Sequence, residues 1–476
     1  MELSLLLKPL GLRFEGNFWV EGITENSKKV LPNFIFFAYK GLSSDGNLFV
    51  KEAIKRGASV VFTDSLKTYR ELRSLIPVFL TENPRKDLAV LSARFYGNPE
   101  RELSIIGITG TNGKTTTSYL TFSAINRIGE RAGIVGTVEW GTEEERFPSD
   151  MTTPSPTDFF RILAYFRDRR VKWVVCEVSS HALELDRVYG VEFKGSVFTN
   201  LSHDHLDFHG DIYNYFLSKE KLFFKSKVSV VNGDDPFGKC LYGLRGIFTR
   251  KFLSYGVEGD YRINQFRDGR YVEISHEGSK YRVETELKGF FNAYNLTASF
   301  SLLSELGFPK DELAVSYTGV KVPGRLEEVR RGVFIDYAHT PDALKKVLKT
   351  LRDITTGRLI VVFGAGGNRD REKRAPMGRV ASEIADLVIL TSDNPRSEPV
   401  ERIISDILSG IDRKEKVTVE LSRREAINLA LSMKKEEDTV LIAGKGHENY
   451  QIIGSVKIPF SDRKVVEEFY GCKKAI

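Results

Sequence analysis

The sequence predicts an α/β protein of three domains, in which a central parallel sheet carries an antiparallel meander and the C-terminal domain is Rossmann-like. Two observations lead to this fold class. Continuous apolar strands alternate with helix patterns from Leu103 onward, which is typical of parallel sheets covered on both faces. The length of 476 residues suggests about three domains, at roughly 100–200 residues each.

Residues 1–100 are expected to form the first domain, which mixes short strands and helices. The stretches FIFFAYKG and SVVFTD are apolar and β-prone. Between them, NLFVKEAIKRGA has helical periodicity and stops at Gly57. The polar stretch YGNPERELS follows and is expected to link this domain to the next.

Residues 101–327 are expected to form the central domain. The strand pattern LSIIGIT leads into GKTTTSYLTFSAINRIG, a helix expected to end at Gly129, and KWVVCEVS and GSVFTN are further buried strands. From about 251 to 287 the pattern changes to alternation, with Asp268-Gly269 and Glu277-Gly278 as turn signals. This segment is therefore predicted to be an antiparallel meander attached to the parallel sheet.

Residues 328–476 are expected to form the third domain, with VPGRLEEV at the boundary. Apolar strand patterns follow, each separated from the next by a helix pattern. They are GVFIDYA, GRLIVVFGAGG, DLVILTSDNP, KVTVEL and DTVLIAGKG. This alternation predicts a doubly wound, Rossmann-like sheet.

Composition limits the class of partner. Lys and Arg exceed Asp and Glu by 70 − 64 = 6 and are interleaved with acids, so no nucleic-acid surface is expected. No segment approaches the roughly 18 consecutive apolar residues of a membrane span. Three scattered cysteines, Cys176, Cys240 and Cys472, form no CxxC pair, which favours a reducing compartment. We therefore expect a cytoplasmic protein, without membrane insertion, that handles anionic small molecules.

The stretch IIGITGTNGKTTT, Ile105 to Thr117, predicts a phosphate-binding loop. Glycines in a strand–helix turn let backbone N–H groups surround an anion at a helix N-terminus. The standard loop is GxxxxGK[ST]; here Ile108 stands where the first glycine belongs, so TGTNGKTT is a variant. The central domain is therefore expected to be P-loop ATPase-like. The residues expected to bind the nucleotide are Gly110, Thr111, Asn112, Gly113, Lys114, Thr115 and Thr116.

Polar groups after two later strands indicate a metal site. Glu177 lies at the carboxyl end of a buried strand, where a carboxylate can complete a Mg²⁺ site opposite the Thr115 hydroxyl. The next strand leads to TNLSHDHLDFHGD, in which one His and one Asp are expected to serve an ATP-bound Mg²⁺. Two alternatives stay open there: structural histidines, and a zinc hydrolase, whose HxHxDH signature is one residue out of register. Lys219, on the helix that follows, is by default expected to be a solvated surface residue.

An ordered set of motifs extends over nearly the whole chain: TGTNGKTT, EVSSH, TNLSHDHLDFHG, KGFFNAYN, PGRLEEV, DYAHTPDAL and SDNPR. Together they resemble the ATP-dependent Mur ligases. The resemblance implies a carboxylate–amine ligase that adds meso-2,6-diaminopimelate to UDP-N-acetylmuramoyl-L-alanyl-D-glutamate in peptidoglycan precursor synthesis. ATP would phosphorylate the γ-carboxylate of the D-glutamate, and the amine would displace the phosphate. Activation is needed because a carboxylate repels nucleophiles and has no leaving group.

The resemblance also implies roles for single residues around ATP. Those implied for catalysis are Lys114, Lys219 and His205. Those implied for further ATP contacts are Asn292, Arg325 and Asp336. Those implied for magnesium are Thr115, Glu177, His205 and Lys219, the last as a carbamate. This role reverses the default expectation for Lys219, because a carbamate turns a cation into an anion that can bind a second Mg²⁺.

Two more sets follow from the resemblance. The set for the nucleotide-sugar substrate is Ser27, Leu42, Ser43, Ser44, Thr152, Thr153, Ser179 and Arg187. The set for diaminopimelate is Arg369, Asp393, Asn394, Pro395, Arg396, Gly444 and Glu448. Arg396 can clamp the second carboxylate of this amino acid bidentately, and Glu448 and Asp393 can take its ammonium. The first set departs from the family at ENSKK, where Asp-Ser-Arg is frequent, and at Leu185, where a polar side chain is common.

Other functions stay open at this point. An L-lysine-adding homologue and a folylpolyglutamate synthetase-like ligase share the mechanism, although the latter would lack the roughly 100 residues ahead of the loop. A P-loop regulatory ATPase is an alternative of a different class. A dinucleotide oxidoreductase is disfavoured because FGAGGNRD is not GxGxxG. We expect a monomer whose partners are UDP-MurNAc-dipeptide, an amino acid, ATP and Mg²⁺.

Overall fold

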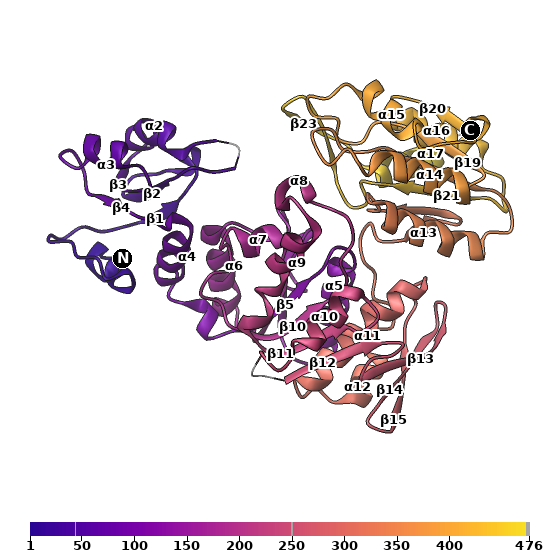
Figure 1. Ribbon diagram of the computed structural model, residues 1–476, viewed down its shortest axis with the longest axis horizontal. Helices are drawn as coiled ribbons and strands as arrows, with labels where there is room; N and C mark the ends of the chain where they lie inside the picture. The colour runs from indigo at the N-terminus through magenta and orange to yellow at the C-terminus, as the bar shows by residue number, and fades with distance from the viewer. Residues whose placement is uncertain (43, 249–250, 473–476) are drawn as a thin grey trace. The chain divides into compact units, whose positions relative to one another are not determined.

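The computed structural model describes residues 1–42, 44–248 and 251–472 and confirms the α/β fold class (Figure 1). The chain folds into two compact units. The first unit comprises Met1–Thr109, Gly129–Ser196 and Ser218–Val228, and the second comprises Gly110–Ile128, Val197–Leu217 and Ser229–Ile476. The division into three domains at residues 100/101 and 327/328 stays a prediction.

The N-terminal sheet is parallel throughout, with strand order β1-β2-β3-β4. Its strands are β1 Gly22–Thr24, β2 Phe34–Ala38, β3 Ala58–Thr63 and β4 Val78–Leu80. Its helices are α1 Leu3–Leu7, α2 Val50–Lys55, α3 Leu66–Leu72 and α4 Pro84–Phe95. Alternate side chains of β2 enter two cores, one with α1 and α4 and the other with α2 and α3. The helix before Gly57 ends as predicted, because Gly57 has φ +110°.

The largest sheet has the strand order β15-β14-β13-β12-β11-β10-β5-β9-β6-β7-β8. Its first strands are β5 Ser104–Thr109, β6 Ala132–Val135, β7 Glu139–Gly141, β8 Arg146–Pro148, β9 Trp173–Glu177, β10 Phe193–Phe198 and β11 Ser226–Asn232. In the first unit, β9 pairs in parallel with both β5 and β6, and Glu177 lies opposite Ile108. The carboxyl ends of β5 and β9 therefore meet at one edge, where ligands bind in open α/β sheets.

The helices of this region are α5 Lys114–Arg127, α6 Pro156–Asp168, α7 Ser180–Glu184, α8 Leu206–His209, α9 Ile212–Glu220, α10 Pro236–Gly243, α11 Phe290–Glu305 and α12 Lys310–Val315. Helix α5 is buried over most of its length although it is rich in hydroxyl residues. Thr117 and Thr121 have partners on α11: Thr117 Oγ1 donates to Asn295 Oδ1 at 3.4 Å and Thr121 Oγ1 donates to Ser299 Oγ at 2.9 Å. Such satisfied polar contacts make a polar helix compatible with burial.

The meander is confirmed from residue 261 onward but is wrong at its start. Strands β13 Tyr261–Arg267, β14 Tyr271–His276 and β15 Ser279–Glu284 are antiparallel neighbours, whereas β12 Lys251–Gly256 pairs with β13 in parallel. The turn residues Gly269, Glu277 and Gly278 all have positive φ, as the predicted turns require. The alternating pattern marked the strands correctly, but alternation alone does not encode the direction of a partner strand.

The C-terminal sheet has the order β16-β17-β21-β18-β19-β20, and every pair except β16–β17 is parallel. Its strands are β16 Glu327–Arg330, β17 Val333–Asp336, β18 Leu359–Phe363, β19 Leu387–Leu390, β20 Val417–Val419 and β21 Thr439–Ala443. Its helices are α13 Pro341–Ile354, α14 Arg374–Ile384, α15 Val400–Leu408, α16 Arg423–Met433 and α17 Asp462–Cys472. Helices α13–α15 cover one face and α16 and α17 the other, which confirms a doubly wound sheet (Figure 1).

Strand β21 comes last in the chain among the strands of the C-terminal sheet, and it lies between β17 and β18. The loop that follows it therefore begins beside the loops that follow β17 and β18. A hairpin of β22 Tyr450–Ile453 and β23 Val456–Pro459 comes next, and a parallel bridge joins its Ile453 to Arg396.

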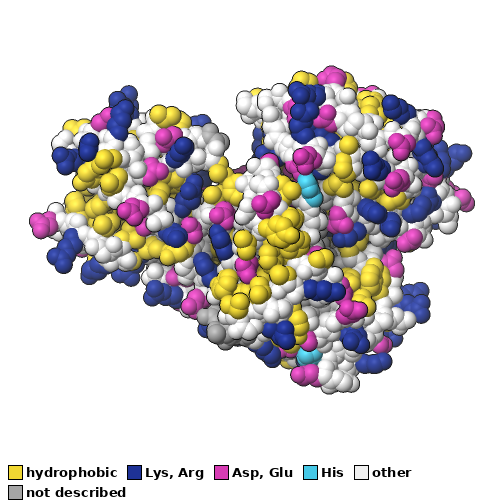
Figure 2. All heavy atoms as spheres, viewed as in Figure 1, with side chains coloured by type: hydrophobic (Ala, Val, Ile, Leu, Met, Phe, Trp, Pro, Cys, Tyr) yellow, Lys and Arg dark blue, Asp and Glu magenta, His cyan; other side chains and the backbone are white. Residues whose placement is uncertain are grey.

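The surface and the helices add two observations. On the face shown in Figure 2, basic and acidic side chains are interspersed. Across the part of the chain that the structure describes, no helix combines the length and the apolar character needed to cross a membrane.

Candidate active site

The loop Gly110–Thr116 joins β5 to α5 and is held by hydrogen bonds on both sides. Lys114 Nζ donates to the carbonyl oxygens of Gly110 and Thr111, at 2.9 and 3.0 Å. The N–H of Thr111 donates to the Asn200 carbonyl at 2.8 Å. The residues predicted to hold phosphate thus form one compact turn at the N-terminus of a buried helix, where the helix dipole favours an anion.

Two glycines explain why the loop departs from the standard spacing. Gly110 has φ +143°, and a Cβ there would lie 1.9 Å from Thr199 Oγ1. Gly113 has φ +89°, and a Cβ there would lie 2.4 Å from Asn295 Oδ1. Ile108, at the position of the standard first glycine, is a fully buried residue of β5. The turn therefore starts two residues later in the chain than the standard pattern assumes.

Replacing Gly113 with alanine is expected to lower the free energy of unfolding by about 2–4 kcal/mol and to weaken ATP binding, because strain and a steric clash add. Gly129 has the same φ, +89°, but nothing lies within 4 Å of its would-be Cβ. Gly129→Ala is therefore the matched control, with an expected cost of about 1 kcal/mol from backbone strain alone. Thermal unfolding and nucleotide titration would measure the stability and the ATP affinity of both variants. Equal losses in the two variants would contradict a steric clash between Asn295 and a side chain at position 113.

Asn292 and Asn295 lie one turn apart on α11, beside the phosphate loop. Asn292 Nδ2 donates to the Lys288 carbonyl at 2.7 Å, and its Oδ1 accepts from Asn295 Nδ2 at 2.9 Å. Both side chains are buried. Asn295 therefore contacts Asn292, a predicted ATP contact, and also occupies the space that a Cβ on Gly113 would need. The motif reasoning named Asn292 alone, although the second asparagine of FFNAYN is visible in the same motif.

Arg325 connects the phosphate loop to the third predicted domain. Its Nη2 donates to Thr115 Oγ1 at 3.0 Å, whereas its Nη1 is buried without a hydrogen-bond partner among the described residues. Asp336 accepts backbone N–H groups from Leu326 and Ala338, at 2.5 and 2.7 Å. Burial raises the pKa of Asp336. The carboxylate of Asp336 therefore holds the backbone next to Arg325.

Asp204 is the centre of a charged cluster that includes His205. Asp204 is nearly fully buried, and its carboxylate lies 3.4 Å from His205 Nε2, 3.7 Å from His339 Nε2 and 3.6 Å from Lys373 Nζ. Burial alone would raise its pKa, but the hydrogen bond to His339 and the charges of His205 and Lys373 hold the pKa of Asp204 well below its usual range. An ionised carboxylate at this distance can orient the His205 ring. Sequence reasoning missed His339 and Lys373, whose partner is distant in sequence.

The zinc-type arrangement of the histidine segment does not form. His209 is buried and stacks on Tyr215, with ring centroids 4.9 Å apart. His203 instead pairs with Asp370 at 2.9 Å, near Glu372. Within the described ranges, these three residues are the group whose ligand atoms could surround a metal ion, and they are not the zinc set.

Glu177 is fully buried at the end of β9, in the first unit. Its carboxylate accepts the N–H and the hydroxyl of Thr137, both at 2.9 Å. Thr137 Oγ1 also forms a hydrogen bond with the hydroxyl of Thr152, at 3.0 Å. A Cβ on Gly136 would lie 2.4 Å from Glu177 Oε1, so glycine is needed there. The motif reasoning missed Thr137, which carries no motif of its own.

Three residues of the predicted nucleotide-sugar set lie beside Glu177. Thr153 Oγ1 donates to the Glu177 carbonyl at 2.8 Å and accepts the Ser179 N–H at 3.1 Å. Arg187 Nη1 donates to the Thr153 carbonyl at 2.9 Å. Burial lowers the pKa of Arg187, which stays a cation. With Thr152, these residues form one polar cluster in the first unit.

The N-terminal members of that set form no such cluster. Ser27 is buried, and its hydroxyl donates to Glu52 Oε2 at 3.3 Å. Leu42 and Ser44 are exposed, and the N–H of the preceding Gly41 bonds to the Ser44 carbonyl. Ser43 lies outside the described residues.

The default expectation of a solvated Lys219 is wrong. The side chain of Lys219, on α9, is 1% exposed. The neighbouring Ser218 is buried as well and donates to Glu184 Oε2 at 2.9 Å. A lysine is seldom buried without a chemical reason, because desolvating its charge is costly.

The predicted diaminopimelate set lies at the carboxyl ends of β18, β19 and β21. Asn394 Nδ2 donates to Glu448 Oε2 at 2.9 Å. A Cβ on Gly444, which has φ +109°, would lie 2.7 Å from Asp393 Oδ2. Lys445 is fully buried and donates to Glu448 Oε2 at 2.7 Å and to Asn394 Oδ1 at 3.2 Å. The sequence prediction did not include Lys445, although it directly follows Gly444, which was included.

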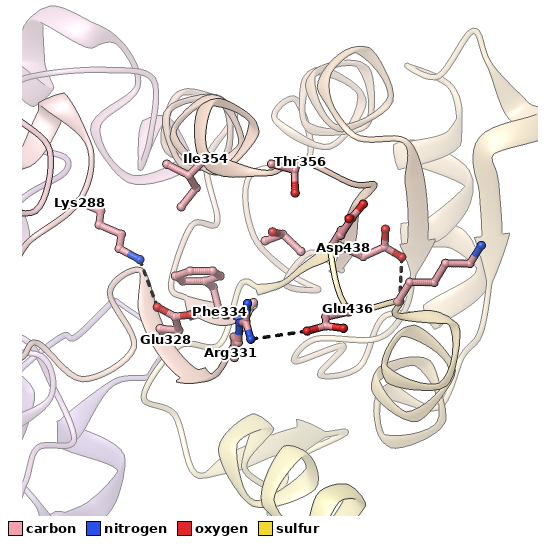
Figure 3. Close-up of a pocket in the computed structure, with 12 residues that line it drawn as sticks. Lys288, Glu328, Arg331, Phe334, Ile354, Thr356, Glu436 and Asp438 are labelled. Atoms are coloured by element: carbon pink, nitrogen blue, oxygen red, sulfur yellow. Dashed lines mark hydrogen bonds and ion pairs between the residues drawn. The ribbon is translucent and has the colours of Figure 1, made fainter.

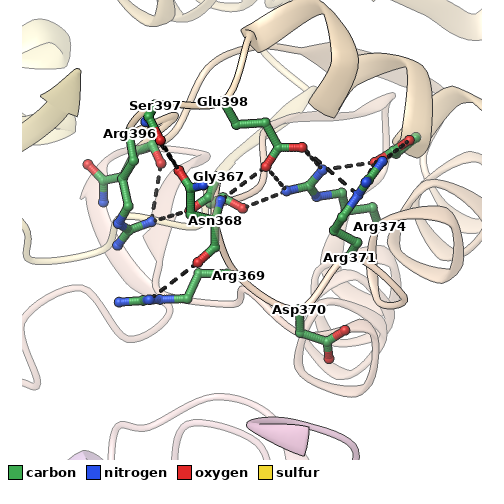
Figure 4. A network of polar contacts seen from close by, with 12 residues as sticks. Gly367, Asn368, Arg369, Asp370, Arg371, Arg374, Arg396, Ser397 and Glu398 are labelled. Carbon is green, nitrogen blue, oxygen red and sulfur yellow. Dashed lines mark hydrogen bonds and ion pairs between the residues drawn. The ribbon is translucent and has the colours of Figure 1, made fainter. Parts of the chain in front are cut away.

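Two arginines of this set lie side by side (Figure 4). Arg396 has φ +54°, and its Nη1 donates to the carbonyl oxygens of Gly367 at 2.9 Å and Asn394 at 3.3 Å. Burial and the neighbouring charge of Arg369 lower the pKa of Arg396. Pro395 directly precedes it in the loop after β19. Two adjacent guanidinium groups are suited to binding an anion such as a carboxylate.

A hollow of about 820 Å³ lies at the opposite edge of the C-terminal sheet (Figure 3). Its lining includes Lys288 paired with Glu328 at 3.1 Å and Arg331 paired with Glu436 at 3.7 Å. The predicted site residues are not part of it. Because ligands of open α/β sheets bind at the carboxyl ends of the strands, we do not assign the active site to this hollow.

Comparison with known proteins decides the family. The Mur ligase middle domain matches residues 108–303, and the Mur ligase glutamate ligase domain matches residues 324–446. The UDP-N-acetylmuramoyl-L-alanyl-D-glutamate--2,6-diaminopimelate ligase of Aquifex aeolicus is 46% identical, over 99% of this chain and 96% of its own.

The chain belongs to the Mur ligase family. Solved Mur ligases share its fold: a diaminopimelate ligase of the same name aligns over the full length of both chains, with TM-score 0.68 and 31% identity. The MurF ligase of Thermotoga maritima in complex with ADP aligns over 95% of this chain and 98% of its own, with TM-score 0.63 and 21% identity. The family resemblance is confirmed, and with it an ATP- and Mg²⁺-dependent ligase of the carboxylate–amine type that acts on small-molecule substrates.

Proposed function

We propose that this Mur ligase joins meso-2,6-diaminopimelate to UDP-N-acetylmuramoyl-L-alanyl-D-glutamate in peptidoglycan precursor synthesis. The observation that carries the proposal is the pair of guanidinium groups, Arg369 and Arg396 (Figure 4). The carboxylates of Asp393 and Glu448 lie close enough for their charges to act on Arg396. Diaminopimelate has a second ammonium and a second carboxylate at the end that does not react. Paired cations near anions suit such a zwitterion, whereas L-lysine lacks the second carboxylate.

The reaction proceeds by activation and displacement. The γ-phosphoryl group of ATP passes to the D-glutamate γ-carboxylate, which gives an acyl phosphate and ADP. The neutral amine then attacks the carbonyl carbon, a proton leaves the nitrogen, and the tetrahedral intermediate collapses to the amide and inorganic phosphate. The enzyme contributes by positioning the substrates and by stabilising negative charge on oxygen.

The residues that would hold ATP are those of the loop Gly110–Thr116, with Asn292, Arg325 and Asp336. Two features favour an anion there: the glycine turn has no room for a Cβ, and Arg325 Nη1 is buried without a partner among the residues described. Lys114, whose Nζ rests on loop carbonyls at 2.9–3.0 Å, can turn to a phosphate oxygen.

We propose that magnesium is bound by the side-chain oxygens of Thr115 and Glu177 and a ring nitrogen of His205. A carbamate on Lys219 would supply a further anionic ligand. When bound, the metal neutralises the phosphate oxygens. The carbamate forms when a neutral lysine amine takes up CO₂ and releases a proton. A buried lysine favours this change, because burial destabilises the ammonium form of a lysine.

For the nucleotide sugar we propose Ser27, Leu42, Ser43, Ser44, Thr152, Thr153, Ser179 and Arg187. The polar cluster beside Glu177 supports the last four. We propose that the amino acid is bound by Arg369, Asp393, Asn394, Pro395, Arg396, Gly444 and Glu448.

We further propose that the protein is a cytoplasmic monomer. Light scattering would measure its molar mass in solution and so test whether it is monomeric.

The activity test measures phosphate release from ATP, Mg²⁺ and the UDP-dipeptide with diaminopimelate, with L-lysine or with no amine. Release is expected only with diaminopimelate, and ¹⁸O placed in the acceptor's γ-carboxyl is expected to appear in the phosphate. Equal rates with L-lysine would favour the lysine-adding alternative. Release without amine or acceptor would favour an ATPase, and phosphate free of ¹⁸O would rule out the acyl phosphate.

A further inference from the structure

The side chain of Arg374, at the start of α14, is fully buried and has acidic partners on two other segments. Its guanidinium donates to both carboxylate oxygens of Glu398, at 2.8 Å each, and to Asp406 Oδ2 at 2.8 Å (Figure 4). It also donates to the Gly366 carbonyl at 3.1 Å. A buried guanidinium is tolerated only with such partners, so the geometry of these contacts is strongly constrained.

Glu398 joins the loop after β18 to the loop after β19. Its Oε2, already bound to Arg374, also accepts the Asn368 N–H at 3.0 Å. The side chain of Asn368 joins the same two loops a second time. Its Oδ1 accepts hydrogen bonds from the Ser397 N–H at 3.1 Å and from the Ser397 hydroxyl at 2.9 Å. Arg374 lowers the pKa of Glu398 to about 2, so this carboxylate stays ionised in the physiological range.

The two joined loops carry Arg369 and Arg396. Arg369 directly follows Asn368 in sequence, and Arg396 precedes Glu398 by two residues. Arg396 also rests on the Gly367 carbonyl of the other loop. Neither arginine forms an ion pair with another of the described residues, although the charges of Asp393 and Glu448 act on Arg396 from farther away. The like charges of the two guanidinium groups therefore repel each other, and the two loops have to be held together. The contacts of Glu398 supply that restraint together with one backbone hydrogen bond, from the Gly367 N–H to the Asn394 carbonyl at 3.0 Å.

We infer that Arg374 and Glu398 form an ionic brace that sets the spacing of Arg369 and Arg396, and so the preference for an amino acid with a second carboxylate. The inference rests on the proposed function. Arg374 and Glu398 are positioning residues: both contact the loops, and their charges are already paired. If the brace is loosened, the two guanidinium groups lose their fixed separation, and a carboxylate can no longer bridge them with good geometry.

The main test is Glu398→Gln in the full-length enzyme. Glutamine keeps the shape and one acceptor oxygen but removes the charge that pairs with Arg374. We expect the KM for diaminopimelate to rise about tenfold, with the KM for ATP and the kcat at saturation changed less than about twofold. The ratio of kcat/KM for diaminopimelate to that for L-lysine is expected to fall by a similar factor.

Arg371→Gln is the matched control. Arg371 shares the Asp406 carboxylate at 3.0 Å but is half-exposed and lies 3.9 Å from Glu398. Its loss removes a similar charge from the same cluster but leaves the hydrogen bonds of Glu398 to Arg374 and Asn368 in place. All three kinetic constants are expected to stay within about twofold of the wild type.

A second variant, Asn368→Gly, keeps the test valid should Glu398→Gln misfold. Asn368 is exposed and has φ +52°, which glycine adopts readily, so the change removes only the side-chain contact to Ser397. The KM for diaminopimelate is expected to rise severalfold.

Each outcome is distinct. A wild-type enzyme without diaminopimelate-dependent phosphate release overturns the proposed function and the brace with it. An active wild type whose folded Glu398→Gln and Asn368→Gly variants keep the normal KM for diaminopimelate overturns the brace alone. A parallel rise in the KM for ATP would show general destabilisation and would also overturn it.

Discussion

Replacing Lys219 with alanine is expected to lower kcat by roughly 10²- to 10³-fold, the usual loss when a group that stabilises transition-state charge is removed. The buried side chain of Lys219 is proposed to carry a carbamate that binds magnesium. Alanine cannot form a carbamate, so the site loses an anionic ligand. Amine-dependent phosphate release measures the effect.

A carbamate on Lys219 should also make the activity depend on CO₂, which can be measured independently of the loss of kcat. Wild-type enzyme stripped of CO₂ is expected to lose activity and to regain it with bicarbonate, whereas the Lys219→Ala variant is expected to stay inactive in both conditions. Lys221→Ala is the matched control, because Lys221 lies two residues away, is exposed and pairs with Glu184 at 2.7 Å. Normal turnover of Lys219→Ala would remove the proposed role, and bicarbonate rescue of that variant would assign the CO₂ effect to another group.

Replacing Arg396 with lysine is expected to raise the KM for diaminopimelate roughly 10- to 100-fold, while the KM for ATP stays nearly unchanged. Lysine keeps the positive charge but loses the planar fork that binds a carboxylate through two hydrogen bonds. The backbone of Arg396, at φ +54°, adds strain for either side chain equally, so the comparison isolates the guanidinium. Steady-state kinetics with each substrate varied in turn measures the effect.

Arg413→Lys, at an exposed arginine of the same sheet domain, is the control for a general effect of the substitution. The discrimination between diaminopimelate and L-lysine is expected to narrow in Arg396→Lys and to stay intact in Arg413→Lys. If the Arg396→Lys variant keeps the wild-type preference for diaminopimelate over L-lysine, the second carboxylate must be recognised by Arg369 or by another residue.

Local features of the chain could be read from the sequence with good accuracy. The strands of the parallel sheets are continuous apolar runs, and their positions are confirmed. Turns at Gly57, Gly269 and Gly278 have the positive φ that the patterns required. The ordered motifs gave the family, which the comparisons confirm. These features depend on neighbouring residues, and the backbone conformation of a short segment is limited by sterics that its own residues set.

Relationships between distant segments could not be read in the same way. Burial of Lys219, the parallel pairing of β12 with β13 and the insertion of β21 between β17 and β18 all depend on which segments fold together. Helical residues such as Lys219 have the same local pattern whether they face solvent or core. The local pattern of this helix therefore predicts a solvated lysine, and only the family resemblance gives Lys219 a role in the site.

The sequence by itself determined the strand and helix content, the phosphate loop and the family, because these follow from local periodicity, glycine placement and motif order. Only the tertiary structure revealed that Asn295 packs against Gly113 and that Thr137 donates hydrogen bonds to Glu177. The same holds for the ion pairs of Arg374 with Glu398 and of Lys445 with Glu448. Apart from Lys445 and Glu448, which are three positions apart, those partners are separated by 24 to 182 positions in the chain and share no local pattern. A buried charge or amide acquires its partner from the packing of whole elements, and that packing is a property of the fold rather than of any single segment.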